Sequence, residues 1–214
     1  MPSATAKICG LTTPEAVSAA LDGGASHIGF VLFKRSPRAI AADAAARLAA
    51  SVRGKAKIVA LMVEPDDAAV AEAVRVLNPD YIQLHGAEDP RRAAAIRALS
   101  GVPTIKAVGV RESADIAAAR PYDDAADHLM FDAKPPLGAD RPGGHGAAFD
   151  WALLKGLKLS RPWFLAGGLN PWNVAEAIDL SGAALVDVSS GVERGPGLKD
   201  PHLITAFLDA VRRA

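Results

Sequence analysis

Short apolar runs rich in β-branched residues alternate along this chain with alanine-rich segments whose apolar positions recur at helical spacing. The apolar runs are bounded by Gly, Pro or Asp and predict these strands: Ala6–Cys9, His27–Leu32, Lys57–Met62, Tyr81–Leu84, Pro103–Val108, His128–Asp132, Trp163–Ala166 and Leu185–Val188. The segments between them predict these helices: Thr13–Asp22, Ala41–Ser51, Asp66–Leu77, Pro90–Leu99, Ser113–Arg120, Trp151–Leu157, Pro171–Asp179 and Pro201–Arg213.

Several of the predicted helices begin with a polar residue that can cap the helix, followed by proline at the first turn. The pairs are Thr13-Pro14, Asn170-Pro171 and Asp200-Pro201. The helix over Asp66–Leu77 also carries an apolar stripe at Val70, Val74 and Leu77. Such a stripe is typical of a helix that packs against a sheet.

Strands that are joined by helical crossovers form parallel sheets, and eight such units close into a barrel of roughly 200 to 250 residues. We therefore expect residues 1–214 to form a single-domain α/β fold, a (β/α)8 TIM barrel. An open doubly wound sheet remains the alternative, because periodicity does not show closure. A Rossmann nucleotide site is disfavoured, since Cys9–Thr12 contains no G-x-G-x-x-G motif. The long irregular stretch is Ala133–Phe149.

The amino-acid composition limits the classes of molecule that this protein is expected to bind. Lys plus Arg and Asp plus Glu each number 24, so the formal net charge is zero. That balance argues against nucleic acid or an anionic membrane as the main partner, but it is compatible with a small anionic ligand. The single cysteine excludes an intrachain disulfide, and no Cys/His cluster has the spacing of metal ligands. With no signal peptide and no long apolar segment, we expect a cytoplasmic protein without a metal.

Polar residues and glycines gather at the predicted carboxyl ends of the strands, where enzymes with this type of barrel have their active sites. The strand interiors are instead Val, Ile, Leu and Phe. This contrast predicts a pocket that is formed by Cys9, Arg35, Ser36, Arg38, His85, Asp132, Gly167, Gly168, Asp187, Ser189, Ser190 and Gly191.

The two glycine-containing turns after the seventh and eighth strands predict a phosphate site. They contribute Gly167 and Gly168 in one turn and Ser189, Ser190 and Gly191 in the other. Barrel enzymes commonly bind phosphate there through backbone N–H groups, and glycine lets the backbone approach the anion closely. Either turn alone would be read as an ordinary tight turn, but two at the expected strand ends favour phosphate binding.

Cys9 and Asp132 are the residues whose chemistry is open to two interpretations. A lone cysteine is usually a small buried hydrophobic residue, but Cys9 ends the first predicted strand and Lys7 points to the same face. To act as a base it needs a lowered pKa or a small population of thiolate. Asp132 follows a buried run and is either a hydrogen-bonded structural group or an acid with a raised pKa.

Three further polar residues have both a structural and a functional interpretation. Asp187 precedes the last turn and favours a structural role, in which it orients its neighbours. His85 can be a ligand or a base, although packing and hydrogen bonding explain it as well. Arg38 is most simply a surface residue of a loop, yet at the mouth of a barrel its guanidinium can hold a carboxylate with two hydrogen bonds.

Motifs along nearly the whole chain resemble one known family, the phosphoribosylanthranilate isomerases of tryptophan biosynthesis. As a set, in this order and at strand ends, these motifs are highly specific. They are Lys7–Thr12, Gly29–Val31, Ser36–Arg38, Gln83–Gly86, Ile105–Val108, Phe131–Lys134, Phe149–Trp151, Ala166–Pro171 and Val186–Glu193.

The resemblance implies an Amadori rearrangement of N-(5-phosphoribosyl)anthranilate, a small sugar phosphate, to its 1-deoxyribulose isomer. It also implies that Cys9 is the general base, that Asp132 is the general acid, and that Arg38 contacts the anthranilate part. The two glycine-containing turns would hold the phosphate, and His85 and Asp187 join the substrate-binding candidates. No cofactor is expected, since the substrate's own amine forms the imine that acidifies the carbon. We expect a monomer or a weak homodimer.

One segment departs from the family pattern, and three other functions compete with this one. The family often has Gly-x-Gly-Lys-Thr before Phe-Asp-Trp, where this chain has Gly144–Ala148, so His145 or Lys134 would have to replace the lysine. A barrel isomerase of aminoimidazole ribotides in the histidine pathway usually uses an aspartate where this chain has Cys9. A cysteine-nucleophile hydrolase or transferase would need a recognisable histidine partner motif. A non-catalytic sugar-phosphate binding protein would not need Cys9 together with Asp132.

Overall fold

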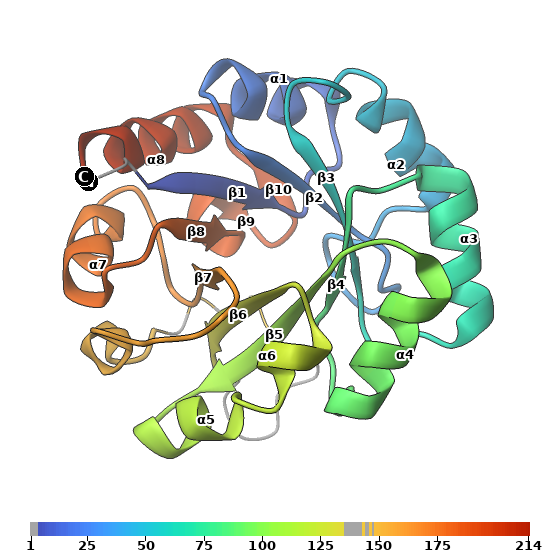
Figure 1. Cartoon of the computed structure of the whole chain (residues 1–214). Helices are drawn as coiled ribbons and strands as arrows, with labels where there is room; N and C mark the ends of the chain where they lie inside the picture. Colours follow the sequence, from blue (N-terminus) through green and yellow to red (C-terminus); the bar gives the residue numbers. More distant parts are fainter. Residues whose placement is uncertain (1–3, 135–142, 144–145, 147) are drawn as a thin grey trace.

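Eight parallel strands form a closed barrel in the computed structural model, which describes residues 4–134, 143, 146 and 148–214 (Figure 1). Each strand pairs with the next along the chain, and β1 pairs with β8 in the register Lys7↔Asp187. This closure confirms the predicted (β/α)8 barrel and removes the open sheet. The strands are β1 (Thr5–Cys9), β2 (His27–Val31), β3 (Lys57–Met62), β4 (Tyr81–Leu84), β5 (Thr104–Val110), β6 (His128–Ala133), β7 (Trp163–Leu165) and β8 (Leu185–Val188).

Helices surround the barrel on its outside (Figure 1). Two of the predicted caps are confirmed, because Thr13 accepts a hydrogen bond from Ala16 N at 3.3 Å and Asp200 accepts one from His202 N at 2.8 Å. The helices are α1 (Pro14–Asp22), α2 (Ala42–Ala49), α3 (Asp67–Leu77), α4 (Pro90–Ser100), α5 (Ser113–Ala118), α6 (Tyr122–Ala125), α7 (Val174–Ser181) and α8 (Pro201–Arg213). No helix in the described part of the chain is long and apolar enough to cross a membrane.

The helix that the sequence predicts over Trp151–Leu157 is not formed. Its place is taken by the short 3-10 helix η1 (Trp151–Leu154), whose N-terminus is capped by Asp150 through Ala152 N at 3.0 Å. Gly156 follows with a φ of 72°, in the left-handed region. A residue in that conformation ends a helix, so the segment completes little more than one turn.

The helix predicted over Pro171–Asp179 begins later, at Val174, and the predicted cap at Asn170 is wrong. Asn170 Oδ1 accepts a hydrogen bond from Trp172 N at 2.9 Å, and Asn173 Oδ1 accepts one from Asn170 N at 2.8 Å. These bonds make residues 170–173 a turn that is closed by the side chains of its two asparagines.

Three smaller differences lie elsewhere in the chain. The helix predicted over Ser113–Arg120 ends at Ala118, and the short α6 follows Pro121. Strand β5 runs on to Val110, beyond its predicted end. A two-stranded antiparallel sheet of β9 (Glu193–Gly195) and β10 (Leu198–Lys199) was not predicted.

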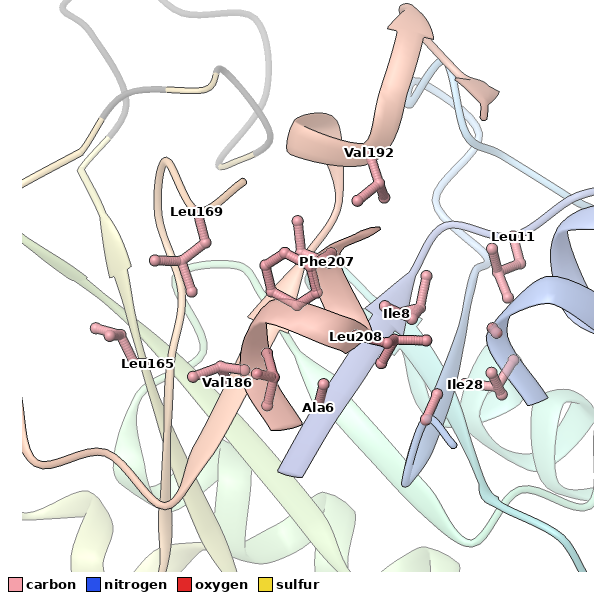
Figure 2. Packing of buried hydrophobic residues seen from close by; sticks show 14 of the residues in the cluster. Ala6, Ile8, Leu11, Ile28, Leu165, Leu169, Val186, Val192, Phe207 and Leu208 are labelled. Atoms are coloured by element: carbon pink, nitrogen blue, oxygen red, sulfur yellow. The ribbon is translucent and has the colours of Figure 1, made fainter. Parts of the chain in front are cut away.

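The core has two layers because side chains alternate between the two faces of each strand. One layer lies between strands and helices, where Ile8 of β1 and Val186 of β8 pack with Phe207 of α8 (Figure 2). The other fills the inside of the barrel and includes Val59, Ile105, Met130 and Phe164. Lys7 and Cys9 alternate with Ile8 along β1, so the first strand directs an amine and a thiol toward the inside.

Candidate active site

A pocket opens at the carboxyl ends of the strands and collects almost all of the predicted site residues. It contains Phe33, Leu61, Val63 and Ala166 as apolar lining. The predicted residues in its lining are Cys9, Ser36, Arg38, His85, Asp132, Gly167, Gly168, Asp187, Ser189 and Ser190. The sequence therefore identified the location of this pocket, although not the contacts within it.

Asp132 is held at both of its carboxyl oxygens. The backbone N–H of Ala133 donates to Oδ1 at 2.8 Å, and His85 Nε2 lies 3.1 Å from Oδ2. The side chain of Asp132 is 14% exposed, so it is accessible from the pocket. On the other side of the imidazole, Gln83 Nε2 lies 2.9 Å from His85 Nδ1. The carboxyl group is thus positioned by two side chains in sequence, Gln83 on β4 and His85 just after the strand.

Cys9 ends β1 with only 3% of its surface exposed. Lys7 lies behind it and forms a buried ion pair with Asp187, with 2.7 Å between Nζ and Oδ1. Burial raises the pKa of the Cys9 thiol above its ordinary value, and nearby Asp187 adds to the rise, whereas Lys7 and Lys199 act in the opposite direction. Two buried cations therefore oppose the desolvation that disfavours the thiolate.

A second buried charge cluster lies near Cys9, and it contributes Arg38 to the pocket lining. Arg38 is 5% exposed, and its Nε and Nη2 donate to the two carboxyl oxygens of Glu193 at 2.6 and 2.8 Å. Lys199 Nζ lies 2.7 Å from Glu193 Oε1. Burial disfavours the charge of Glu193, but Arg38 and Lys199 hold its pKa below the ordinary value. Burial lowers the pKa of Lys199 to about 8, and the charge of Glu193 limits the fall.

This arrangement corrects the simplest interpretation of Arg38 and extends the structural interpretation of Asp187. Arg38 is not a surface residue, since its guanidinium lines the pocket and is anchored on Glu193 by two parallel hydrogen bonds. Asp187 orients its neighbour, as expected, by pairing with Lys7. Both carboxylates therefore place cations around the pocket.

The two predicted phosphate turns lie next to each other. Gly167 and Gly168 have φ values of 84° and 70°, in the left-handed region. A Cβ atom on Gly191 would lie 1.9 Å from the carbonyl oxygen of Leu169, so only glycine allows this approach. Gly191 is absent from the pocket lining but permits the second turn to pack against the first.

Backbone N–H groups in the first of these turns are without a protein acceptor among the described residues. Within the described ranges, the N–H groups of Gly167 and Gly168 donate to no protein acceptor. Ser189 is more constrained, because its hydroxyl donates to Cys9 O at 3.2 Å and Lys199 Nζ donates to Ser189 O at 2.7 Å. An anion that enters the pocket between the turns would meet uncompensated backbone donors.

Three other residues that the sequence singled out either lie away from the centre of the pocket or are not among the described residues. Lys134 lines the pocket, but its ammonium group pairs with Asp115. Arg35 is exposed, with its guanidinium carbon 6.0 Å from the centre of the Phe33 ring. His145 lies outside the described residues.

Sequence reasoning missed Glu193, Lys199 and Gln83 as parts of the site. Glu193 and Gln83 belong to motifs that the sequence shows, whereas Lys199 lies beyond the last motif. Gln83 contacts His85, whereas Glu193 and Lys199 pair with each other, and only the folded structure reveals that these polar groups have buried partners. The short spacing between Glu193 and Lys199, which pair across the β9–β10 hairpin, could have identified these two residues as partners.

Comparison with known proteins gives a consistent picture. The family model for N-(5'phosphoribosyl)anthranilate isomerase matches residues 6–210. A protein of Caulobacter vibrioides with that name is 59% identical over 210 residues, covering 98% of this chain and 96% of the relative. A Rhizobium meliloti protein of the same name is 52% identical, with 97% of each chain covered.

Solved structures agree with the sequence relatives. Phosphoribosyl anthranilate isomerase from Thermotoga maritima has a TM-score of 0.89 and 32% identity, and covers 99% of this chain and 100% of its own. A structure of such an isomerase in complex with reduced 1-(o-carboxyphenylamino)-1-deoxyribulose 5-phosphate has a TM-score of 0.83 and 30% identity, with 99% and 100% covered. A Thermotoga maritima structure described as monomers of a dimeric isomerase has the same TM-score of 0.83, 30% identity and the same coverage.

Proposed function

The chain belongs to the N-(5'-phosphoribosyl)anthranilate isomerase family, and on that premise we propose that Cys9 is its general base and Asp132 its general acid. The enzyme is an aldose–ketose isomerase of tryptophan biosynthesis that catalyses an Amadori rearrangement. One observation supports the assignment of the two residues. Cys9 on β1 and Asp132 on β6 line one pocket, and β7 and β8, which carry the phosphate turns, lie between their strands.

The substrate has two anionic ends, and the pocket has a counterpart for each. The phosphate lies between the turns at Gly167–Gly168 and Ser189–Ser190, where backbone N–H groups can donate to it. The anthranilate then reaches across the pocket toward Arg38, whose anchored guanidinium donates to the carboxylate. This orientation places the ribose over the middle of the barrel, between Cys9 and Asp132.

Asp132 begins the reaction by protonating the furanose ring oxygen. The bond between carbon 1 and this oxygen breaks, and the nitrogen lone pair forms the Schiff base. The carboxylate that remains accepts from Ala133 N and faces His85 Nε2, so its new charge is stabilised at both oxygens. Gly167 and Gly143 leave room for this carboxyl group, since a Cβ atom on either would approach its oxygens to 3.1 or 3.0 Å.

Cys9 continues the reaction by taking the proton from carbon 2. The electron pair of that C–H bond forms the enolamine, which gains a proton at carbon 1 as its 2-hydroxyl becomes the ketone. A thiolate with a raised pKa is a strong base but a minor species at neutral pH. Lys7 and Lys199 favour the thiolate by their charge and so limit this loss. A positioned acid or base commonly contributes about 10² to 10⁴-fold to the rate.

We also propose an oligomeric state, a mechanism without a cofactor and a location for this enzyme. The expected monomer or weak homodimer stays a proposal, and one solved relative from Thermotoga maritima is described as a dimeric isomerase. The reaction conserves oxidation level between substrate and product and uses the substrate's own amine, which supports a mechanism without a cofactor. Its place in tryptophan biosynthesis supports the expected cytoplasmic location.

The acid and base assignments can be tested by the loss of phosphoribosylanthranilate fluorescence. Cys9→Ala and Asp132→Asn should each lower kcat by about 10²-fold or more while the thermal unfolding of the protein is little changed. The matched control is Asp67→Asn, which changes an exposed carboxylate that pairs with Arg92 outside the pocket lining and should retain nearly full turnover. Near-normal turnover in folded Cys9→Ala or Asp132→Asn would remove that residue from the mechanism.

A further inference from the structure

Gln83 is a buried polar residue that no step of the mechanism uses. It lies on β4, is 0% exposed, and does not line the pocket. Its Nε2 is 2.9 Å from His85 Nδ1 and 3.3 Å from Met130 Sδ. Its Oε1 is buried and has no hydrogen-bond partner within the described part of the chain. A buried amide with one unpartnered oxygen is costly, so it calls for an explanation.

The orientation of the amide follows from counting donors and acceptors. With Nε2 toward His85, the amide leaves one acceptor unpaired and places a donor near the sulfur of Met130, a weak acceptor. The reversed amide would place two N–H donors where Oε1 now lies without a partner, and an oxygen lone pair against the sulfur. The first orientation leaves fewer groups unsatisfied, so Gln83 donates to His85 Nδ1.

This donation determines the protonation of the imidazole. A ring nitrogen that accepts a hydrogen bond carries no proton, so the proton of neutral His85 is on Nε2. Nε2 lies 3.1 Å from Asp132 Oδ2, and His85 therefore donates to the carboxyl group. We propose that Gln83 is a positioning residue for the acid, because its buried amide fixes His85 as the Nε2–H tautomer that donates to Asp132.

The contribution to catalysis rests on the proposed role of Asp132 as the acid. As Asp132 transfers its proton to the ring oxygen, a negative charge develops on its carboxyl group. The Nε2–H of His85 and the N–H of Ala133 are already directed at the two oxygens and stabilise that charge without reorganisation. The other tautomer would present a lone pair to Oδ2 and would oppose the same step.

The tautomer itself can be measured in the unliganded enzyme by ¹⁵N NMR of the histidine rings near pH 7.5. The His85 signal is identified by its loss in His85→Gln. We expect a protonated-type Nε2 and an unprotonated-type Nδ1 in the wild type, and the same result in Asp132→Asn, because Gln83 sets the tautomer. A wild-type His85 that is protonated at Nδ1 would overturn the proposal, whatever the activity of Asp132→Asn.

Kinetics then test whether the tautomer matters. Gln83→Leu removes the donor, and Gln83→Met provides a second variant of similar length. Either should give a mixed tautomer and lower kcat by about tenfold, with little change in KM, since the lost interaction strengthens only in the transition state. The matched control is Met130→Leu, which removes the other contact of Gln83 and should keep both tautomer and kcat.

The two proposals fail in different ways. Full turnover of Asp132→Asn would overturn the acid assignment and leave the tautomer result standing. A folded Gln83→Leu enzyme with wild-type kcat would overturn the positioning role, even if Asp132→Asn is inactive.

Discussion

Arg38 is the residue at which substrate recognition and internal packing can be separated by experiment. Its guanidinium lines the pocket and is fixed by two hydrogen bonds to Glu193, so it is held in one orientation before a ligand arrives. Lysine keeps the charge but cannot donate in two parallel directions. We therefore expect Arg38→Lys to weaken turnover substantially and Arg38→Ala to weaken it more.

The magnitude follows from the bonds that are lost. A hydrogen bond to a charged group is worth about 1.5 to 3 kcal/mol, which corresponds to a loss of roughly 10 to 150-fold in kcat/KM for Arg38→Ala. Because Arg38 is only 5% exposed, solvent screens its hydrogen bonds little, and the loss in kcat/KM should not be reduced by screening. Arg38→Ala should destabilise the protein less than the loss of the whole Arg38–Glu193 pair would, because Glu193 keeps Lys199 as a partner at 2.7 Å. We expect the free energy of unfolding to fall by about 1 to 3 kcal/mol.

The assay compares kcat/KM from fluorescence loss with the free energy of unfolding in urea. Arg35→Ala is the control, since Arg35 is exposed three residues away and should lose much less activity. A substrate analogue that lacks the ring carboxylate should be turned over equally poorly by wild type and Arg38→Ala. Equal losses at Arg35 and Arg38 would indicate a general electrostatic attraction, and an unchanged kcat/KM in Arg38→Ala would refute the assignment.

Two further predictions concern His27, at the start of β2, and the two phosphate turns. Burial lowers the pKa of His27 to about 4 from 6.5, so the folded protein binds fewer protons than the unfolded chain between these pH values. The free energy of unfolding should therefore fall by up to about 3 kcal/mol as the pH drops through this range. Urea titrations at several pH values should show a smaller fall in His27→Leu. Inorganic phosphate should inhibit competitively and shift the backbone amide NMR signals of Gly168 and Ser190, whereas the largest shifts near Arg35 would reverse the orientation of the substrate.

The barrel could be predicted from the sequence because its signal is repeated. Each unit pairs a short apolar run with an amphipathic segment, and an error in one unit does not change the topology. The errors lie where one residue outweighs the pattern. Gly156 in the left-handed region ends the expected sixth helix, and Asn170 and Asn173 use their side chains to form a turn where a helix start was predicted.

The location of the site could also be predicted, because residues at the ends of parallel strands meet at one end of a closed barrel. Cys9, Asp132 and the glycine turns need no long-range information beyond this rule. Their partners do need it. Glu193 and Arg38 are 155 positions apart in the chain, and Lys7 and Asp187 are 180 apart, so neither pair has a local signal.

The polar residues inside the barrel have different consequences once their partners are known. Gln83 is an ordinary polar residue in a strand sequence, and only the 2.9 Å contact with His85 connects it to Asp132. Lys7 already shares a face with Cys9 in the sequence, but only the structure shows that it is buried, pairs with Asp187 and favours the thiolate by its charge. In both cases the group is held away from the substrate and acts through a neighbour. Physical reasoning from sequence finds the groups that face the pocket, while the residues that set their protonation emerge from the packing behind them.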